Sequence, residues 1–410
     1  MKNNRTFLDK LLDGAEVEWR TLDEISSIYG GLTGKNKSDF ENGNVFYVPY
    51  KNIFNNIEVD FDNLELVNVS DDEKQYEIQY GDVLFTGSSE TAEEAGMSSA
   101  VTTKINQKIY LNSFSFGLRF NDDIKILPEF SKFLFRTHSI RTEIAKSASG
   151  VTRFNISKAR FKKIKIPIPP LSVQTEIVRI LDALTALTSE LTSELTSELI
   201  LRQKQYEYYR EKLLSFDSLE RLNKGGVKKK LIDVSDIQWL PLNKIYKFQY
   251  GVGNKIPTIG GKYPVYGSNG IVGTHNEYNS ENSPVIGHIG AYAGIVNWAE
   301  GKHFVTYNGI ICKKINDNVN ERYAYHLLLL QNFIDKANKA SQPFISYDIL
   351  NKCIVPIPSL EEQNRIVSIL DKFETLTNSI TEGLPLAIEQ SQKRYEYYRE
   401  LLLSFPKLDN

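Results

Sequence analysis

The sequence predicts an α+β protein in which two globular α+β domains are separated by two long antiparallel helices that form a coiled coil with pseudo-two-fold symmetry. Three observations predict this fold class. One supersecondary unit occurs twice in the chain. Each copy has the apolar periodicity of a helix. The segments outside the copies are rich in Gly, Asn, Ser, aromatic and β-branched residues, which is typical of short strands joined by turns.

The repeated unit begins at Ile166 and returns at Val355, an offset of 189 residues. From Ile166 to Asp182, 10 of 17 residues are identical in the second copy. From Arg202 to Phe216, 12 of 15 are identical. Because the offset is the same at both ends, the two copies have equal length, and we expect them to form the same structure twice.

Each copy is predicted to be one long helix that follows a proline-rich opening. Ser359 and Glu362 form a capping box ahead of the second helix. At ~1.5 Å per residue, a helix over 171–216 would be about 70 Å long. An apolar stripe runs along each helix, and we expect the two stripes to pack on each other. The stripes consist of Leu184, Leu187, Leu191, Leu195 and Leu199 in the first helix, and of Leu376, Ile380, Leu384 and Ile388 in the second.

The two helices are predicted to differ at their centres. Residues 188–199 are three tandem copies of Thr-Ser-Glu-Leu, and each copy adds about one turn of helix. A repeat of four overshoots the helical period by ~40° per step, so the leucine stripe should wind slowly around the helix. Gly383 and Pro385 should interrupt the second helix, because proline lacks the backbone N–H that a helix interior requires. Both features indicate a length adjustment in a coiled coil.

The regions 13–160 and 233–350 are predicted to be globular α+β domains. They share an opening at an offset of 220 residues and then align poorly. Strands are expected at 83–85, 101–103, 116–118, 265–266, 284–286, 294–296 and 310–311, and helices at 130–146 and 323–339. The predicted segments are a first domain over 1–165, a first helix over 166–216, a second domain over 217–354 and a second helix over 355–410.

Composition indicates a cytoplasmic protein without a membrane-spanning segment. The start MKNNRTFLDK lacks the apolar core of a secretory signal, and the longest leucine run, 327–330, is too short to span a bilayer. Cys312 and Cys353 form neither a disulfide framework nor a zinc pattern. The formal net charge is −2, but basic residues cluster at 158–165 and again at 224–230. These clusters are either solvated faces or phosphate contacts.

The sequence contains no catalytic signature. There is no Asn-Pro-Pro-Tyr or Asp-Pro-Pro-Tyr element of an amino-methyltransferase, and neither 30–35 nor 260–262 completes a phosphate-binding P-loop. Gly251-Val252-Gly253 is too short for a dinucleotide fingerprint, and the five histidines lack metal-ligand spacing. We therefore expect a binding protein with no catalytic, cofactor or metal site of its own.

The chain resembles the specificity subunit of type I restriction–modification systems over essentially its whole length. The resemblance rests on the proline-rich openings with Gln174 and Gln363, the repeated Tyr-Glu-Tyr-Tyr-Arg ends and the tandem Thr-Ser-Glu-Leu units. It is closest to the subgroup whose central helix carries Thr-Ala-Glu-Leu repeats. The resemblance implies that the two domains are target-recognition domains, that each reads half of a bipartite double-stranded DNA sequence, and that the paired helices set the spacer between the halves.

The resemblance also implies the partners and the cofactors. Two methyltransferase subunits would dock on the chain and methylate adenine, and motor–nuclease subunits would join them for cleavage. S-adenosylmethionine, ATP and Mg²⁺ would bind to these partners, with none in this chain.

The family's reading loop falls on 81–89 in the first domain and on 284–290 in the second. Base edges are read by Arg, Lys, Asn, Gln, Ser and His, and phosphates are held by Lys and Arg. The candidate DNA contacts are Lys35, Lys37, Thr86, Ser88, Ser89, Arg153, Lys158, Arg160, Lys162 and Lys163 in the first domain, and Lys255, Lys262, His288 and Tyr292 in the second. The candidate spacer repeat is carried by Leu187, Leu191, Leu195 and Leu199.

Two alternatives come from other functional classes. A methyltransferase fused to its own recognition domains would need a further cofactor-binding domain of about 200 residues, for which the chain has no room. A two-domain structural adaptor on a coiled coil would explain the repeat, but it would not explain why the two domains diverge.

Overall fold

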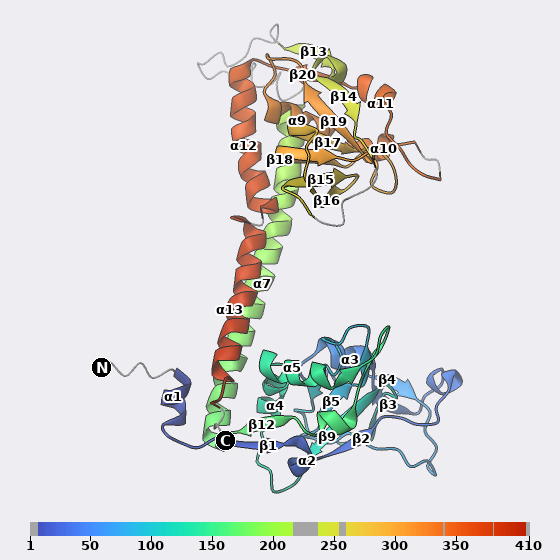
Figure 1. Cartoon of the computed structure of the whole chain (residues 1–410), viewed down its shortest axis with the longest axis vertical. Coiled ribbons are helices and arrows are strands. Elements are labelled where there is room, and N and C mark those ends of the chain that lie inside the picture. Colours follow the sequence, from blue (N-terminus) through green and yellow to red (C-terminus); the bar gives the residue numbers. More distant parts are fainter. Residues whose placement is uncertain (1–6, 216–236, 254–259, 339–340, 380, 407–410) are drawn as a thin grey trace. The chain divides into compact units, whose positions relative to one another are not determined.

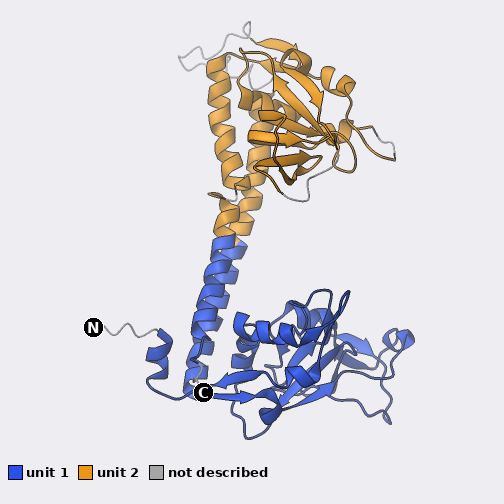
Figure 2. Cartoon of the chain, viewed as in Figure 1, with its two compact units in different colours: residues 1–193, 389–410 blue, residues 194–388 orange. Residues whose placement is uncertain are grey.

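The computed structural model describes residues 7–215, 237–253, 260–338, 341–379 and 381–406. The chain forms two compact units (Figure 2). Unit 1 contains residues 1–193 and 389–410, and unit 2 contains residues 194–388. Each unit therefore combines one globular domain with part of the first long helix and part of the second. No helix in the described ranges is both long and apolar enough to cross a membrane.

The main sheet of unit 1 has four antiparallel strands in the order β2-β9-β5-β7. These strands are Ser26–Gly30, Ser115–Phe120, Val83–Thr86 and Ser98–Ala100. Figure 1 labels three of them, β2, β9 and β5. A second sheet, β4-β3-β8, pairs β3 in parallel with β8, and two further small sheets are β10-β11-β6 and β1-β12. Their strands are β1 Glu18–Thr21, β3 Val45–Val48, β4 Glu65–Val67, β6 Ser88–Ser89, β8 Ile109–Leu111, β10 Ala148–Ser149, β11 Phe154–Ile156 and β12 Lys165–Ile168. The shorter helices are α1 Phe7–Leu12, α2 Leu22–Ile25, η1 Lys37–Phe40, α3 Tyr50–Asn55, α4 Pro128–Leu134, α5 His138–Ser147 and α6 Lys158–Phe161.

Unit 2 has one six-stranded sheet where unit 1 has a four-stranded and a three-stranded sheet. Its sheet has the order β14-β19-β17-β18-β15-β16, with β15 parallel to β18, and β13 pairs separately with β20. The strands are β13 Gln238–Pro241, β14 Tyr246–Tyr250, β15 Tyr263–Gly267, β16 Gly270–His275, β17 Ser280–Gly287, β18 Val296–Val305, β19 Gly309–Lys314 and β20 Ile354–Ile357. The shorter helices are η3 Leu242–Lys244, α9 Glu321–Leu330, α10 Phe333–Lys336 and α11 Tyr347–Asn351.

The two domains are held by matching backbone hydrogen bonds, although their sequences align poorly. Four pairs of N–H to carbonyl bonds, each with an N–O distance of 2.8–3.2 Å, occupy the same places in the two topologies. In unit 1 the bonds run from Leu22 to Ile164, from Gly31 to Ser115, from Ile156 to Gly87 and from Gly96 to Thr86. Their counterparts in unit 2, in the same order, run from Leu242 to Cys353, from Gly251 to Gly309, from Ile345 to His288 and from Gly294 to Gly287. The internal repeat thus extends through the globular domains at the level of the backbone.

The first long helix is continuous and the second is broken. Helix α7 spans Leu171–Leu214, whereas the second copy forms α12, Leu360–Asn378, and α13, Leu384–Leu402. The predicted interruption at Gly383 and Pro385 is confirmed. A β-carbon on Gly383 would lie 2.5 Å from the carbonyl oxygen of Thr375, so only glycine fits this turn.

The long helices run antiparallel and belong to the cores of both domains. In unit 1, Ile177 near the start of α7 shares a core with Leu402 at the end of α13. In unit 2, Leu214 at the end of α7 shares a core with Ile366 near the start of α12. The predicted class, two α+β domains with paired antiparallel helices, is confirmed. The boundaries of the two compact units differ from those of the four segments expected from the sequence, because each unit includes a part of both helices.

The seam of α7 follows a heptad and not the four-residue repeat. A set of partly or fully buried positions is spaced alternately three and four residues apart, at Thr185, Thr188, Thr192, Leu195, Leu199, Arg202, Tyr206 and Tyr209. Leu184, Glu198, Gln205 and Arg210, each next to one of these positions, are also partly buried. The Thr185 hydroxyl donates to Tyr395 Oη at 3.1 Å, and the Tyr206 and Tyr209 rings stack on Phe373. Leu187 is 61% and Leu191 39% exposed, so the prediction that all five leucines form the contact stripe is wrong. The rotation of ~40° per unit carries Leu187 and Leu191 off the seam.

Several predicted elements of the globular domains have different limits in the structure. The helices expected at 130–146 and 323–339 are each divided in two. Thr137, in extended conformation, separates α4 from α5, and Asn332, at φ 45°, precedes α10. The strand expected at 101–103 is wrong, because β7 ends at Ala100, and β18 begins only at Val296. Ile380 of the expected stripe lies outside the described residues.

Two buried glutamines join each globular domain to its helix in the same way. The Gln174 side chain, fully buried at the start of α7, accepts from the Leu127 N–H and donates to the carbonyls of Lys125 and Pro169. In unit 2 the fully buried Gln363 accepts from one backbone N–H and donates to two carbonyls in the same way. Buried amides are costly unless they are paired, so each glutamine fixes the opening of its helix against the domain.

Candidate nucleic-acid interface

Residues from four separate segments of unit 1 line an open cavity of about 580 Å³. Its lining combines aromatic, hydroxyl and charged side chains, namely Tyr50, Lys51, Phe54, Ser88, Ser89, Glu90, Glu94, Phe114, Thr152 and Arg153. Three of these residues, Ser88, Ser89 and Arg153, are DNA contacts predicted from the sequence. Aromatic faces interleaved with hydrogen-bonding groups are the kind of surface on which nucleic-acid bases are held.

The loop that carries Ser88 is fixed by its neighbours. It leaves the end of β5, and the Gly87 N–H donates to the carbonyl of Phe114 at 2.7 Å. The Tyr50 hydroxyl donates to the Ser88 carbonyl at 2.8 Å. Antiparallel pairing between β6 and β11 places Ser88 opposite Asn155. The loop is therefore held from three sides, and its side chains project from a defined backbone.

Arg153, the residue that precedes β11, extends its side chain into this cavity. Its Nε donates to Ser88 Oγ at 3.0 Å, and its guanidinium carbon lies 5.6 Å from the centre of the Phe114 ring. Phe114 is 60% exposed, although a phenylalanine in a folded domain is usually buried. Tyr50 and Phe54 stack on each other at 5.9 Å on the same cavity. The guanidinium thus has a fixed plane and lies within an aromatic surface.

Unit 2 carries different side chains on the same loops. His288 occupies the place of Gly87, and its ring lies 4.2 Å from the Tyr250 ring and 5.1 Å from the Tyr307 ring. The Ser268 hydroxyl donates to the carbonyl of Ile289 at 2.8 Å, as Tyr50 does to Ser88 in unit 1. Tyr292, in the turn that follows, is 52% exposed. Loop positions are thus held alike in the two units and filled differently.

Comparison with known proteins decides the family. Residues 15–200 and 225–390 match the family model of the type I restriction modification DNA specificity domain. The chain belongs to this family. It is a DNA specificity subunit of a type I restriction–modification system, and chains of this kind are its non-catalytic components. The expectation that the chain is not an enzyme follows from that membership.

Similarity to relatives extends over nearly the whole chain. The specificity subunit is 41% identical over 423 residues to S.HindORF215P of Haemophilus influenzae, with 99% of this chain and 100% of the relative covered. It is 31% identical over 447 residues to the EcoR124I/EcoR124II specificity subunit of Escherichia coli, with 98% of each chain covered. Its fold is similar to that of the HsdS subunit from Thermoanaerobacter tengcongensis, at a TM-score of 0.52 and 16% identity, over 96% of this chain and 98% of the other.

The structure corrects two of the predicted DNA contacts of the specificity subunit. Thr86 is fully buried, and its hydroxyl accepts from the Met97 N–H, so the side chain cannot reach DNA. The Lys35 side chain is only 5% exposed and donates to Glu73 at 2.6 Å. The Lys35 ammonium and two further hydrogen bonds lower the pKa of Glu73 to about 2. Lys35 therefore stabilises the domain and offers no free charge to a phosphate.

The other basic candidates of the first domain lie outside the cavity. Lys37 is exposed at the start of η1, and Lys158 lies on α6 with its Nζ over the Phe116 ring. Arg160 donates weakly to the carbonyls of Lys146 and Ala148, and Lys162 pairs with Asp23 at 2.9 Å. Lys163 is exposed, two residues after the end of α6. These residues could contact phosphates, whereas Arg153 lies among base-sized aromatic surfaces.

The remaining candidate DNA contacts of the second domain differ in their exposure to solvent. Lys262 is exposed beside the Tyr263 ring. His288 is 5% exposed and bonds to the carbonyl of Tyr307, so it supports the loop and presents little surface. Lys255 and the basic cluster at 224–230 lie outside the described residues. Sequence reasoning missed Tyr50, Phe114 and Glu94, although an aromatic residue in the polar turn 112–115 is a signal that points to Phe114.

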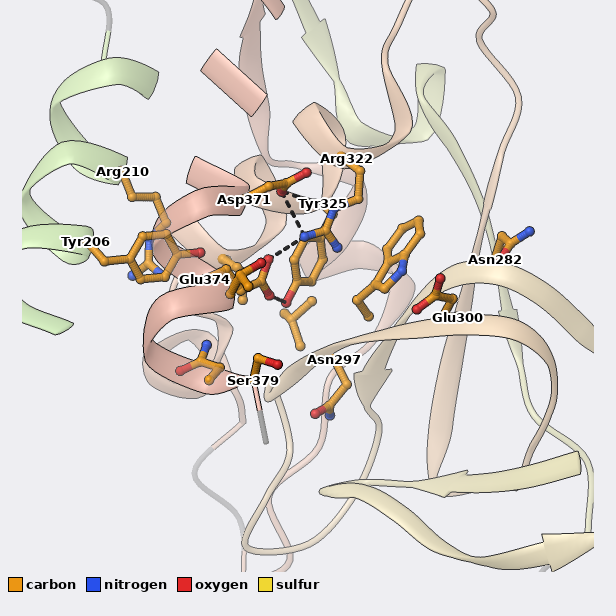
Figure 3. Close-up of a pocket in the computed structure, with 15 residues that line it drawn as sticks. Tyr206, Arg210, Asn282, Asn297, Glu300, Arg322, Tyr325, Asp371, Glu374 and Ser379 are labelled. Carbon is orange, nitrogen blue, oxygen red and sulfur yellow. Dashed lines mark hydrogen bonds and ion pairs between the residues drawn. The ribbon is translucent and has the colours of Figure 1, made fainter. Parts of the chain in front are cut away.

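A second cavity, of about 790 Å³, lies in unit 2 between the long helices and the globular domain (Figure 3). Arg322 donates to Asp371 at 2.8 Å and also bonds to Glu374, and its guanidinium lies 4.9 Å from the Trp298 ring and 4.8 Å from the Tyr325 ring. His326, Asp371 and Glu374 lie close enough together to share a metal ion. Arg322 already neutralises both carboxylates, so this group is a structural ion-pair network.

Two effects act on the Asp371 carboxyl in this network. Burial alone would raise its pKa, but the hydrogen bonds from His326 and Arg322 outweigh burial and lower it. Burial raises the pKa of the neighbouring Tyr206 hydroxyl to about 12. The network therefore favours the ionised Asp371 carboxylate and the neutral Tyr206 hydroxyl, and it joins α9 to α12 and α7.

Proposed function

We propose that each globular domain of this specificity subunit reads one half of a bipartite double-stranded DNA target. The observation that carries the proposal is the contrast between a shared backbone and divergent loops. The same hydrogen bonds hold 87–89 and 288–290, yet the side chains there and around them differ. A constant support with variable loops is how one fold presents different recognition surfaces. Two such surfaces on one chain would read two different half-sites.

We propose further that the long helices set the spacer and that two methyltransferase subunits dock on them. Adenine methylation, with S-adenosylmethionine, would then occur on those subunits, and cleavage, with ATP and Mg²⁺, on motor–nuclease subunits in the cytoplasm. The internal repeat of the helices supports two equivalent docking sites. A solved structure has a similar fold, at a TM-score of 0.57 and 16% identity, over 95% of this chain and 98% of the other. That structure is described as the structural basis of complex assembly and conformational transition of the type I restriction–modification system.

The exchange of one domain tests the reading proposal. Residues 13–160 are replaced by those of a related subunit with a different target, and the chimera is expressed with its methyltransferase subunits. Long-read sequencing then maps the methylated adenines. We expect one half of the methylated motif to change while the other half and the spacer stay the same. The reciprocal exchange of 233–350 is the control, and it should change only the other half. A change of both halves by either exchange contradicts modular reading.

We propose that the chain belongs to the subgroup with Thr-Ala-Glu-Leu-type repeats, in which the repeats of the central helix set the spacer. Deletion of residues 192–195 removes about 6 Å of α7, or one to two base pairs at about 3.4 Å each. Because α12 and α13 keep their lengths, we expect a spacer one base pair shorter between unchanged half-sites. Replacement of Ser193 by Ala is the control that keeps the length, and it should leave the spacer unchanged. An unaltered spacer after the deletion contradicts the proposal.

A further inference from the structure

We propose that Arg153 reads a guanine in the half-site of the first domain, with Ser88 and Phe114 as its positioning residues. This inference rests on the proposed function and names one base that the site would recognise. A guanidinium that presents two parallel N–H groups matches the O6 and N7 acceptors of guanine in the major groove. The geometry of the cavity in unit 1 supplies the conditions for that contact.

The first condition is that the terminal nitrogens are available. Arg153 Nε is engaged by Ser88 Oγ at 3.0 Å, and within the described part of the chain Nη1 and Nη2 have no hydrogen-bond partner. Ser88 is itself 6% exposed, and its carbonyl is held by the Tyr50 hydroxyl. The inner edge of the guanidinium is therefore anchored to a buried serine, and the outer edge, which carries the bidentate donors, remains for a ligand.

The second condition is that the plane of the guanidinium is fixed before DNA binds. The 5.6 Å separation between the guanidinium carbon and the Phe114 ring centre is within the range of a cation–π contact. A side chain already held in one orientation loses less conformational entropy on binding than a free arginine does. Phe114, 60% exposed, also presents an apolar surface next to the donors, where a base or a thymine methyl group could pack.

The third condition concerns the alternative ligand, a phosphate. Lys51 and Arg153 share the cavity with Glu90 and Glu94, so its charged side chains balance. Glu94 lies close to the loop itself, because Ser89 and Thr91 donate to its carboxylate at 3.3 and 3.0 Å. The two carboxylates would repel the negative charge of a phosphate brought to Arg153, whereas a guanine carries no net charge to repel. The cavity therefore favours a base over the DNA backbone.

The second domain has a different residue at the same place. Matching bonds from Ile156 to Gly87 and from Ile345 to His288 align the two segments, and Gln342 occupies the position of Arg153. Gln342 is exposed. Glutamine pairs with adenine rather than guanine in the major groove. The guanine contact is therefore expected in the first half-site, and the equivalent position in the second half-site should not depend on an arginine.

The experiment uses the full chain assembled with its methyltransferase subunits. Mapping of methylated adenines first defines the motif, and the exchange of residues 13–160 identifies the half that the first domain reads. Binding is then measured on duplexes in which each guanine of that half is replaced in turn by 7-deazaguanine, which lacks the N7 acceptor. We expect one such guanine to matter, with a loss of affinity of about 5- to 150-fold. Arg153→Gln should abolish the sensitivity at that position only.

Lys51→Gln is the matched control, because it removes one positive charge from the same cavity. It should leave the 7-deazaguanine sensitivity intact, and thermal melting should show that both variants fold. The inference is overturned if the half-site contains no guanine, or if Arg153→Gln weakens all sequences equally and lowers the salt slope by about 1, as the loss of a phosphate contact would. Absence of any bipartite methylated motif would instead overturn the proposed function on which the inference rests.

Discussion

The two globular domains hold their loops with the same backbone hydrogen bonds but place different side chains on them. In unit 1 the loop after β5 carries Ser88 and contacts Arg153, whereas in unit 2 the matching loop carries His288 among tyrosine rings. The difference shows which positions are free to vary. Side chains that project from this hydrogen-bonded frame without joining the core, such as Arg153 and the matching Gln342, can change without loss of the fold, and these are the positions available for recognition.

The supports of the two domains differ less than their loops do. Gln174 and Gln363 make equivalent bonds, and both domains use a glycine with positive φ after the reading loop, Gly96 at 68° and Gly294 at 95°. The ion pairs that join each globular domain to its long helix use different residues in the two units. Lys132 bridges Asp182 and Glu58 in unit 1, whereas Arg322 bridges Asp371 and Glu374 in unit 2. Variants at paired positions can therefore test how far the equivalence extends.

The largest effect is expected from the two buried glutamines. Gln174→Ala and Gln363→Ala each leave one N–H and two carbonyls without their partner, at about 1–3 kcal/mol for each group. We expect each variant to lose about 3 kcal/mol or more from the free energy of unfolding of its own unit, measured by chemical denaturation. The exposed pair Gln203→Ala and Gln392→Ala is the control and should cost less than about 0.5 kcal/mol. A large loss of unfolding free energy for only one of the two variants would show that the two glutamines are not equivalent.

A smaller and unequal effect is expected from the two glycines. Gly96→Ala and Gly294→Ala both force a left-handed backbone on an L-residue, which costs about 1–3 kcal/mol. At Gly96 the added β-carbon would lie 2.5 Å from the Ile144 side chain, which can move, whereas at Gly294 it would lie 2.5 Å from the backbone of Phe333 and Ile334. Thermal melting should therefore show a larger loss for Gly294→Ala. Equal losses would mean that the strain alone decides the cost.

The smallest effect concerns acid stability in unit 2. The pKa of Asp371 is lower in the folded state than its ordinary value of 3.8, so its contribution to stability is present above that value and is lost as pH falls through the folded pKa. Because the Asp371 side chain is 36% exposed, we expect less than about 1 kcal/mol. Unfolding of wild type and of Asp371→Asn should be compared between pH 7 and pH 3. The difference between the two should shrink at low pH.

The loop cavity shows what sequence reasoning could not reach. Ser88 and Ser89 were predicted because the reading loop of the family falls on 81–89, and Arg153 because arginine is a residue type that contacts bases and phosphates. Tyr50 and Phe114 were not, because they reach the same cavity from α3 and from the turn before β9. Lys35 was predicted from its residue type and Thr86 from its place in that loop, and only the structure shows that Lys35 is paired with Glu73 and that Thr86 is buried. Residue type gives the chemistry of a side chain, but its neighbours decide whether that chemistry is available.

The sequence by itself determined the internal repeat, the two long helices, the break at Gly383 and Pro385, and the family. These features are local or periodic, and periodicity can be read from a single chain. Only the tertiary structure decided that each unit combines both helices, that the seam follows a heptad through Thr185 and Tyr206, and that Arg153 meets Ser88 and Phe114. These features depend on contacts between residues far apart in the sequence. No local pattern encodes them, because strand pairing and helix packing bring together segments whose residues carry no mark of one another.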